Sequence, residues 1–536
     1  MMTDRAAEVD AGDRGVGSAG ATRGYVCPAR DQLFLMPVSM RDWLEEGHLA
    51  FFVLEVVAEL DTACLHRRPG GCPGRPPYEP EMMVALLLYA YCCGIRSSRR
   101  IEAQCRTDAA FRVICGGLVP DHATIARFVA WHEHALEGLF VEGVRLCAAA
   151  GLADLSVVAL DGTKIAADAS LARNRDGGWI RREIAKLMAV TAEDEPLAMA
   201  DPDRLARAWP AGEISTPTGR LARLQAALEV IKAEDAAVAA EAERSAQAVA
   251  ALAEQGRQQI GRKPKHPHAA LQRAEIDYAV ARQRLEDLQA ERERRAAAAA
   301  RGEKTGGPRL RIDKAQDALA AAQVRLTDAR AAVQATPQAE RRVNITDPDS
   351  RIMSTKDGWV QGYNAQAMVN PQQIVLAVDV SQDPGDVGLY QPMNKRLEQT
   401  LTAAGITGEV ELELADAGYC SEHNLTCPGP DRLIATTKDW KQRRAARELG
   451  HTDGPPPPDA TPLEEMEHLL RTPQGTAAYK QRSQLIEPVF GDRKHNRQIR
   501  SFRRRGLTAA RSEWAFIHLA GNMLKLYQHR SAAAIA

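Results

Sequence analysis

The sequence lacks a net charge of either sign. Its 536 residues carry 69 Lys and Arg against 70 Asp and Glu, which gives a formal charge of -1. A chain that is basic throughout is therefore excluded, and a nucleic-acid partner would have to be bound by a local basic cluster. The position of the charges consequently matters more than their sum.

The sequence also lacks a long apolar segment. The longest apolar run, Met82–Cys93, is too short to cross a bilayer. The first residues contain no apolar core of the kind that a secretory signal needs. We therefore expect a cytoplasmic protein that does not associate with a membrane.

Closely spaced cysteine pairs are missing as well. Eight of the ten cysteines lie between Cys27 and Cys147, and none forms a C-x-x-C pair, which argues against a zinc ribbon or a disulfide framework. Hydrophobic residues make up 45% of the chain and charged residues 26%, so wholesale disorder and a fibrous repeat are excluded. Because 536 residues exceed what one hydrophobic core organises, we expect several folded domains.

The amino-terminal quarter of the chain is predicted to be helical after a short tail. Residues 1–24 are rich in Gly, Ala and charge without periodicity, which predicts disorder. Residues 25–150 have a helical pattern, and Arg96, Arg99 and Arg100 could bind phosphate there. The stretch Pro120–Phe128 has a polar cap before an apolar run, which fits the second helix of a helix-turn-helix and equally an ordinary capped helix.

A long insertion has the texture of a coiled coil. From Arg220 to Val333 apolar residues step by three and four, which predicts three helices with narrow apolar seams. The breaks between these helices are basic, and we expect the first of them to contact DNA or support assembly through Arg262, Lys263 and Lys265.

Strand-like segments flank this insertion. Residues 156–161 precede it, and residues 362–369, 374–380, 409–416 and 432–437 follow it, with a helix predicted for residues 386–404. We therefore expect a mixed α/β domain that a helical domain interrupts.

Two carboxylates end predicted strands. Asp161 and Asp416 each come at the end of a strand-like run and close to a glycine. If the two strands are neighbours, these acids converge, and two such anions tolerate each other when a divalent cation lies between them. A pair of Mg²⁺ ions about 4 Å apart could activate a water and stabilise the leaving oxygen of a phosphodiester. Glu487, near the start of a late helix, could complete the metal site.

Glu487 lies in a basic segment. Residues 480–511 contain ten Lys or Arg against two acids. Pro488 favours a helix that begins at Glu487, which places Lys494 two turns further on the same face, where it could bind phosphate. Other basic side chains expected to contact DNA here are Arg493, Arg497 and Arg500. A solvated basic helix without a ligand is the alternative.

In combination these motifs resemble bacterial insertion-sequence transposases of the DDE class. The matching stretches are Val158–Ile165, Ile345–Arg351, Gly362–Gln366, Leu414–Tyr419 and Ile486–Gly491. The resemblance implies an RNase H-like fold with Asp161, Asp416 and Glu487 as the catalytic and metal-binding triad. It also implies that Tyr479, Arg482 and Lys494 are the other members of a Tyr-Arg-Glu-Lys signature that binds DNA. Four residues separate Arg482 from Glu487 here, where the signature usually has three.

The resemblance gives a complete prediction of domains. The fold class is an α/β RNase H-like catalytic domain, with a mixed sheet flanked by helices, interrupted by a helical coiled-coil insertion and preceded by an all-α domain. The boundaries are 1–24 for the tail, 25–150 for the helical DNA-binding domain, 151–180 and 345–530 for the catalytic domain, and 181–344 for the insertion.

The expected function is DNA transposition with two Mg²⁺ ions, for which Mn²⁺ could substitute. The expected partners are double-stranded DNA, namely the element's terminal inverted repeats and the target, and a second copy of the chain in a homodimer or larger complex. The protein would be nucleoid-associated when bound to DNA. The alternatives are an RNase H-fold nuclease without strand transfer, a non-catalytic transposase-derived DNA-binding protein, and a coiled-coil scaffold.

Overall fold

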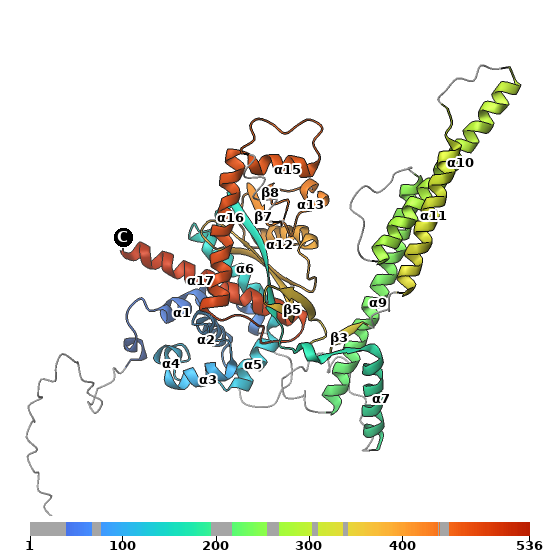
Figure 1. Ribbon diagram of the computed structural model, residues 1–536. Helices are drawn as coiled ribbons and strands as arrows, with labels where there is room; N and C mark the ends of the chain where they lie inside the picture. Colours follow the sequence, from blue (N-terminus) through green and yellow to red (C-terminus); the bar gives the residue numbers. More distant parts are fainter. Residues whose placement is uncertain are drawn as a thin grey trace, which may run out of the picture.

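The computed structural model describes most of the chain. The described residues are 39–66, 77–193, 217–254, 267–302, 309–335, 341–437, 439 and 450–535. The predicted tail, residues 1–24, lies outside these ranges. The predicted DNA contacts Arg262, Lys263 and Lys265 lie outside them as well. Figure 1 shows a body built around a β-sheet and an arm of long helices that extends from it.

The amino-terminal region is helical, as predicted. Its helices are α1 (Leu49–Glu59), α2 (Pro80–Cys92), α3 (Ser98–Thr107), α4 (Ala109–Ile114), α5 (His122–Trp131) and α6 (Glu133–Ala149), with short 3₁₀ turns at Met40–Trp43 and Ala63–His66. The side chain of Asp121 caps α5 by accepting from the amides of Ala123 and Thr124. Nine of the thirteen residues of α2 are buried, so this helix runs through the core and not along its surface.

A mixed sheet forms the centre of the body. Its strands are β1 (Val157–Ala166), β4 (Arg351–Thr355), β5 (Gly358–Val369), β6 (Val375–Ser381), β7 (Leu412–Ala415) and β8 (Asp431–Ile434). The order is β4-β5-β1-β7-β8, and β6 also pairs with β5. Strand β5 is antiparallel to β1, β4 and β6, whereas β1, β7 and β8 are parallel. The predicted mixed sheet is therefore present, and β4 is a strand that the sequence pattern missed.

The register of β1 and β7 brings two acids to one place. Leu160 pairs with Ala415, so the next residues along the two strands are Asp161 and Asp416. The prediction that β1 ends at Asp161 is wrong, because the strand continues to Ala166 by pairing with β5. Asp161 thus lies in the middle of β1. It is paired with β5 on one side, and on the other side it lies just past the last residue that pairs with β7.

Helices cover the sheet. They are α12 (Tyr390–Ala403), α13 (Glu422–Thr426), α15 (Pro462–Arg471), α16 (Pro473–Gly491) and α17 (Leu507–Ile535), with a 3₁₀ turn at Val387–Leu389 and a π-helical turn at Asp492–Asn496. Helix α16 lies against β1, β5 and β7 (Figure 1). The amino-terminal helices and these carboxy-terminal helices share one hydrophobic core with the sheet.

Helix α16 does not begin where the sequence predicted. It starts at Pro473, because the side chain of Thr472 accepts from the amide of Gly475 and Pro473 occupies the first turn. Pro488, which suggested a helix start at Glu487, lies inside the helix close to its end. A capped start fourteen residues upstream therefore outweighs the preference of one proline.

The insertion contains the three predicted long helices. They are α9 (Pro217–Glu254), α10 (Pro267–Ala300) and α11 (Ile312–Ala335), which follow α7 (Gly177–Glu193). Helices α10 and α11 run side by side away from the body (Figure 1). At the base, β2 (Asn174–Asp176) pairs with β3 (Arg342–Asn344), and Ile180, Leu224 and Ile231 belong to a separate small core. No helix in the described part of the chain is long and apolar enough to span a membrane.

Candidate active site

Asp161 and Asp416 are the centre of the candidate site. They follow paired residues on adjacent parallel strands, where neighbouring backbones run about 4.8 Å apart. Each carboxylate accepts a backbone amide through its Oδ1 atom, Asp161 from Gly162 at 2.8 Å and Asp416 from Gly418 at 2.7 Å. The glycines that accompany both acids thus bring a backbone N–H to each carboxylate.

The environment of Asp161 disfavours its negative charge. Burial, together with the nearby charges of Asp416 and Asp386, raises the pKa of Asp161 to about 6, although the guanidinium of Arg482 opposes the shift. The two acids therefore lie in a place where positive charge is needed.

Helix α16 supplies that charge. The Nη2 atom of Arg482 donates to Oδ2 of Asp161 at 2.9 Å, and the side chains of Arg482 and Asp161 are only 14% and 21% exposed. One turn earlier, the hydroxyl of Tyr479 donates to the carbonyl of Ala415 at 3.1 Å. Tyr479 and Arg482, both predicted to bind DNA, thus join α16 to the end of β7 and to the middle of β1 in this structure.

Lys494 and Lys164 lie near the same acids. Burial lowers the pKa of Lys494, which is also affected by the charges of Asp161, Asp357, Lys164 and Lys356. Lys164 forms an ion pair with Asp386, with 3.3 Å between Nζ and Oδ1. Lys494 comes from the π-helical turn and Lys164 from β1, so two distant segments contribute positive charge to one place.

A network of buried polar side chains lies beneath the acids. Asn364 donates to Asp386 at 2.7 Å, Gln366 donates to Asn364 at 2.9 Å, and the hydroxyl of Tyr419 donates to Gln366. A Cβ at Gly162 would overlap the end of the Gln366 side chain, which would have to move to admit it. The sequence singled out the stretches that contain Asn364, Gln366 and Tyr419 but gave no role for these side chains. Asp386 had no signal beyond its position at a helix start.

Glu487 is not part of this cluster. It is exposed on the outer face of α16, whereas Leu485, Ile486 and Val489 are buried against the body. Within the described ranges, no three His, Cys, Asp or Glu side chains are close enough together to hold a metal ion. The structure therefore brings together two members of the predicted triad and leaves the third outside.

Three of the predicted DNA-binding arginines lie in the interior. Arg96 is paired with Glu513, and Arg493 is paired with Asp492. Arg497 also bonds to Asp492, at 2.8 Å, and donates to two carbonyls of the helix that carries Tyr91 and Cys92. We withdraw these three from the DNA-binding set because a guanidinium that is buried against a carboxylate cannot reach a phosphate. Arg99, Arg100 and Arg500 are exposed.

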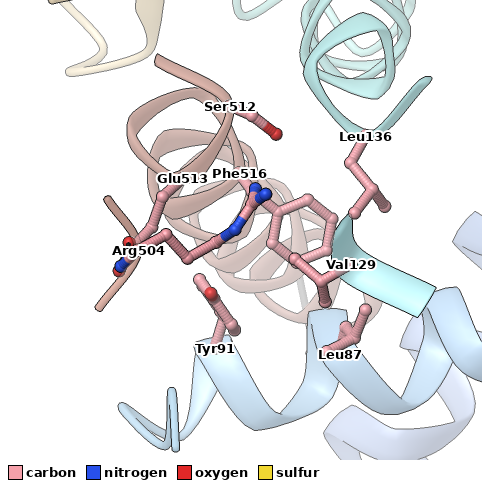
Figure 2. A pocket seen from close by; sticks show the side chains of 8 residues that line it. All are labelled: Leu87, Tyr91, Val129, Leu136, Arg504, Ser512, Glu513 and Phe516. Atoms are coloured by element: carbon pink, nitrogen blue, oxygen red, sulfur yellow. Dashed lines mark hydrogen bonds between the residues drawn. The ribbon is translucent and has the colours of Figure 1, made fainter. Parts of the chain in front are cut away.

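A small pocket lies elsewhere in the body, among α2, α5, α6 and α17. Figure 2 shows its lining, which includes Leu87, Tyr91, Phe516 and the charged Arg504 and Glu513. Glu513, one of these lining residues, forms the ion pair with Arg96, which lies in the loop before α3. None of the lining residues belongs to the acid cluster, so this pocket is a gap in helix packing and not part of the candidate site.

Comparison with protein families gives two matches. Residues 38–131 match the family described as Transposase domain (DUF772), and residues 458–527 match the Transposase DDE domain. The first match covers α1 to α5, and the second covers α15, α16 and most of α17, including Tyr479, Arg482, Glu487 and Lys494. No curated protein and no solved structure matches the chain. Together, the two matches support an insertion-sequence transposase of the DDE class.

Proposed function

We propose that the protein binds the ends of its insertion sequence, cleaves phosphodiester bonds with a divalent metal and joins the freed 3′ ends to target DNA. The observation that carries this proposal is the pair Asp161 and Asp416, which follow paired residues on adjacent parallel strands, with the guanidinium of Arg482 bound to Asp161. Three antiparallel strands, β6, β5 and β1, continue into two parallel ones, β7 and β8, and this order supports an RNase H-like catalytic domain.

The donor set fits a hard cation. Two half-buried carboxylates offer only oxygen, the ligand that Mg²⁺ prefers, and their mutual repulsion favours a cation between them. Asp161 and Asp416 would hold the metal, with Glu487 as the third ligand and Mn²⁺ as a substitute. When bound, a pair of Mg²⁺ ions activates the attacking oxygen and stabilises the leaving oxygen of the phosphodiester.

The lysines position the DNA backbone. Lys494 is half-buried beside Asp161, so a phosphate that it holds lies next to the acids. Lys164 is restrained by Asp386, which keeps its ammonium on the same side of the sheet. Lys356 extends this positive region from the turn that precedes β5.

The remaining regions deliver the DNA ends. Arg99 and Arg100 are exposed on α3, close in sequence to the capped helix α5, and we assign end binding to these amino-terminal helices. The arm of α9, α10 and α11 is a coiled-coil module that grips DNA or holds two protomers together. Two ends are processed together, so the active complex is at least a homodimer.

The test is Mg²⁺-dependent cleavage and joining of labelled DNA that carries the terminal sequences flanking the gene. The intact protein should cut and join, whereas Asp161→Asn and Asp416→Asn should bind DNA and do neither. Asp379→Asn is the matched control. Asp379 lies on β6 of the same sheet, outside the site, and forms an ion pair with Arg511 of α17 at 2.8 Å.

Each other outcome selects a different reading. Full activity of Asp161→Asn would show that the site is wrong. Cutting without joining of a pre-cut end would favour the nuclease, and DNA binding without any reaction would favour a non-catalytic DNA-binding protein.

A further inference from the structure

In helix α16, Ile486 is buried against the body and Glu487, the predicted metal ligand, is exposed. Arg482 reaches Asp161, and the residue four positions later, on nearly the same helical face, is Ile486, which is fully buried. Glu487 is five positions from Arg482, about 140° around the helix, and is exposed. One residue too many separates Arg482 from Glu487 for both to face the acids in a regular α-helix.

The hydrogen-bond ladder of α16 is interrupted at this point. Pro488 has no N–H, so the carbonyl of Gln484 receives no bond from the residue four positions ahead. That carbonyl instead accepts from the side chain of Gln373 at 3.3 Å. The turn that contains Glu487 is therefore held by one fewer backbone bond than its neighbours.

A π-helical turn follows directly. The amide of Arg497 donates to the carbonyl of Asp492, five residues back, at 3.0 Å. A π turn holds one extra residue and rotates the chain beyond it by about 100° relative to an α-helix. The segment thus already contains an extra residue, in a turn that begins at Asp492.

The packing of that π turn leaves polar atoms unsatisfied. Nε of Arg493 is buried without a hydrogen-bond partner in the described part of the chain, and the same holds for both ring nitrogens of His518. Buried polar groups without partners are costly, so they raise the free energy of this arrangement relative to alternatives.

The sequence of α16 also suits a second register. Leu485, Ile486 and Val489 are buried now, and Phe490 is partly buried. A one-residue rotation would bring Ile486 and Phe490 to the places of Leu485 and Val489, so apolar side chains would still face the body there.

We propose that Pro488 is a positioning residue that lets α16 widen into a π turn across Gln484–Val489, which turns Glu487 by up to about 100° toward Asp161 and Asp416. A π turn passes over one amide nitrogen, and a proline nitrogen has no hydrogen bond to lose there. The inference rests on the proposed role of Glu487 as the third metal ligand. The described conformation is then the resting register of the site.

The experiment measures Mn²⁺ binding to the full-length protein by electron paramagnetic resonance of the free ion, without DNA. Asp161→Asn and Glu487→Gln come first and should both weaken Mn²⁺ binding. Pro488→Ala should then weaken it by at least tenfold, since alanine favours an uninterrupted α-helix over proline by on the order of a hundredfold, and affinity falls with the population of the competent register. Gln373→Asn, which keeps a residue tolerant of its positive φ but cannot reach Gln484, should tighten binding.

A rescue variant separates register from simple damage. Exchanging the two residues, Ile486→Glu with Glu487→Ile, puts the carboxylate four positions from Arg482 and should restore Mn²⁺ binding in the Pro488→Ala background. Wild-type Mn²⁺ affinity in Pro488→Ala would overturn the inference while leaving the metal site intact. Wild-type affinity in Asp161→Asn would overturn the proposed function, and with it the inference.

Discussion

The interior position of Arg96 leads to a stability prediction. Its Nη1 atom donates to Glu513 at 2.7 Å and to the carbonyl of Ser501 at 3.1 Å, and the side chains of Arg96 and Glu513 are 5% and 1% exposed. Arg96→Met would leave the Glu513 carboxylate buried without its counterion. Removing one partner of a buried pair costs about 3–5 kcal/mol, so the apparent free energy of unfolding should fall by that amount.

The assay is urea unfolding followed by tryptophan fluorescence, since the buried Trp514 adjoins Glu513 in the chain. Arg99→Met is the matched control, because Arg99 is exposed and its loss should change stability by less than about 0.5 kcal/mol. Adding Glu513→Gln to Arg96→Met should recover part of the loss, as the neutral side chain still accepts the backbone amide of Arg503.

The opposite pattern would refute this assignment. If Arg96→Met kept the unfolding midpoint and lost DNA affinity, while Arg99→Met bound DNA normally, Arg96 would be a DNA ligand and the buried pair would not exist in solution.

Three further predictions follow from other parts of the body. Burial raises the pKa of Glu413 to about 7, although hydrogen bonds from Tyr390 and Asn394 lower it. Folding therefore favours the protonated acid. The contribution of Glu413 to stability is present in full below pH 4.5 and is lost as the pH rises through about 7. Glu413→Gln should therefore stabilise the protein by up to about 3 kcal/mol at pH 8 and much less at pH 5 in thermal melts, and an equal gain at both pH values would contradict the buried acid. Gly362→Ala should destabilise more than Gly162→Ala, because the new Cβ meets a backbone carbonyl in the first case and the end of a side chain in the second; equal unfolding midpoints would argue against this strand packing. Lys494→Ala should reduce the slope of log affinity for DNA against log salt concentration by about one in a filter-binding titration, and an unchanged slope would remove Lys494 from the phosphate contacts.

Local periodicity was enough to predict much of the fold. The three-and-four spacing of apolar residues from Leu221 onward predicted α9, and alternating or apolar runs predicted β5 and β7. These elements form where the pattern lies because each buries a continuous apolar face. The same patterns placed Asp161 and Asp416 at the ends of strand-like runs and close to a glycine. For this reason these two acids could be proposed without a structure.

The errors concern partners that lie far away in the chain. Arg96 looked like a phosphate ligand until α17 supplied Glu513, which is 417 residues further along. Nothing near Asp386 in sequence indicates that it faces Asp161. Short-range patterns carry no information on which distant charge will share a buried site.

The sequence by itself determined the helical amino-terminal region, five strands of the central sheet, the inserted helices and the chemical identity of the candidate acids. These depend on residue type and on spacing within one element. Tertiary structure decided which arginines are buried, where α16 begins and which of its residues faces the sheet. The side chain that faces the sheet depends on helix rotation, and rotation is set by the sum of contacts with β1, β5 and β7. In the resulting rotation Ile486 is buried and Glu487 is exposed.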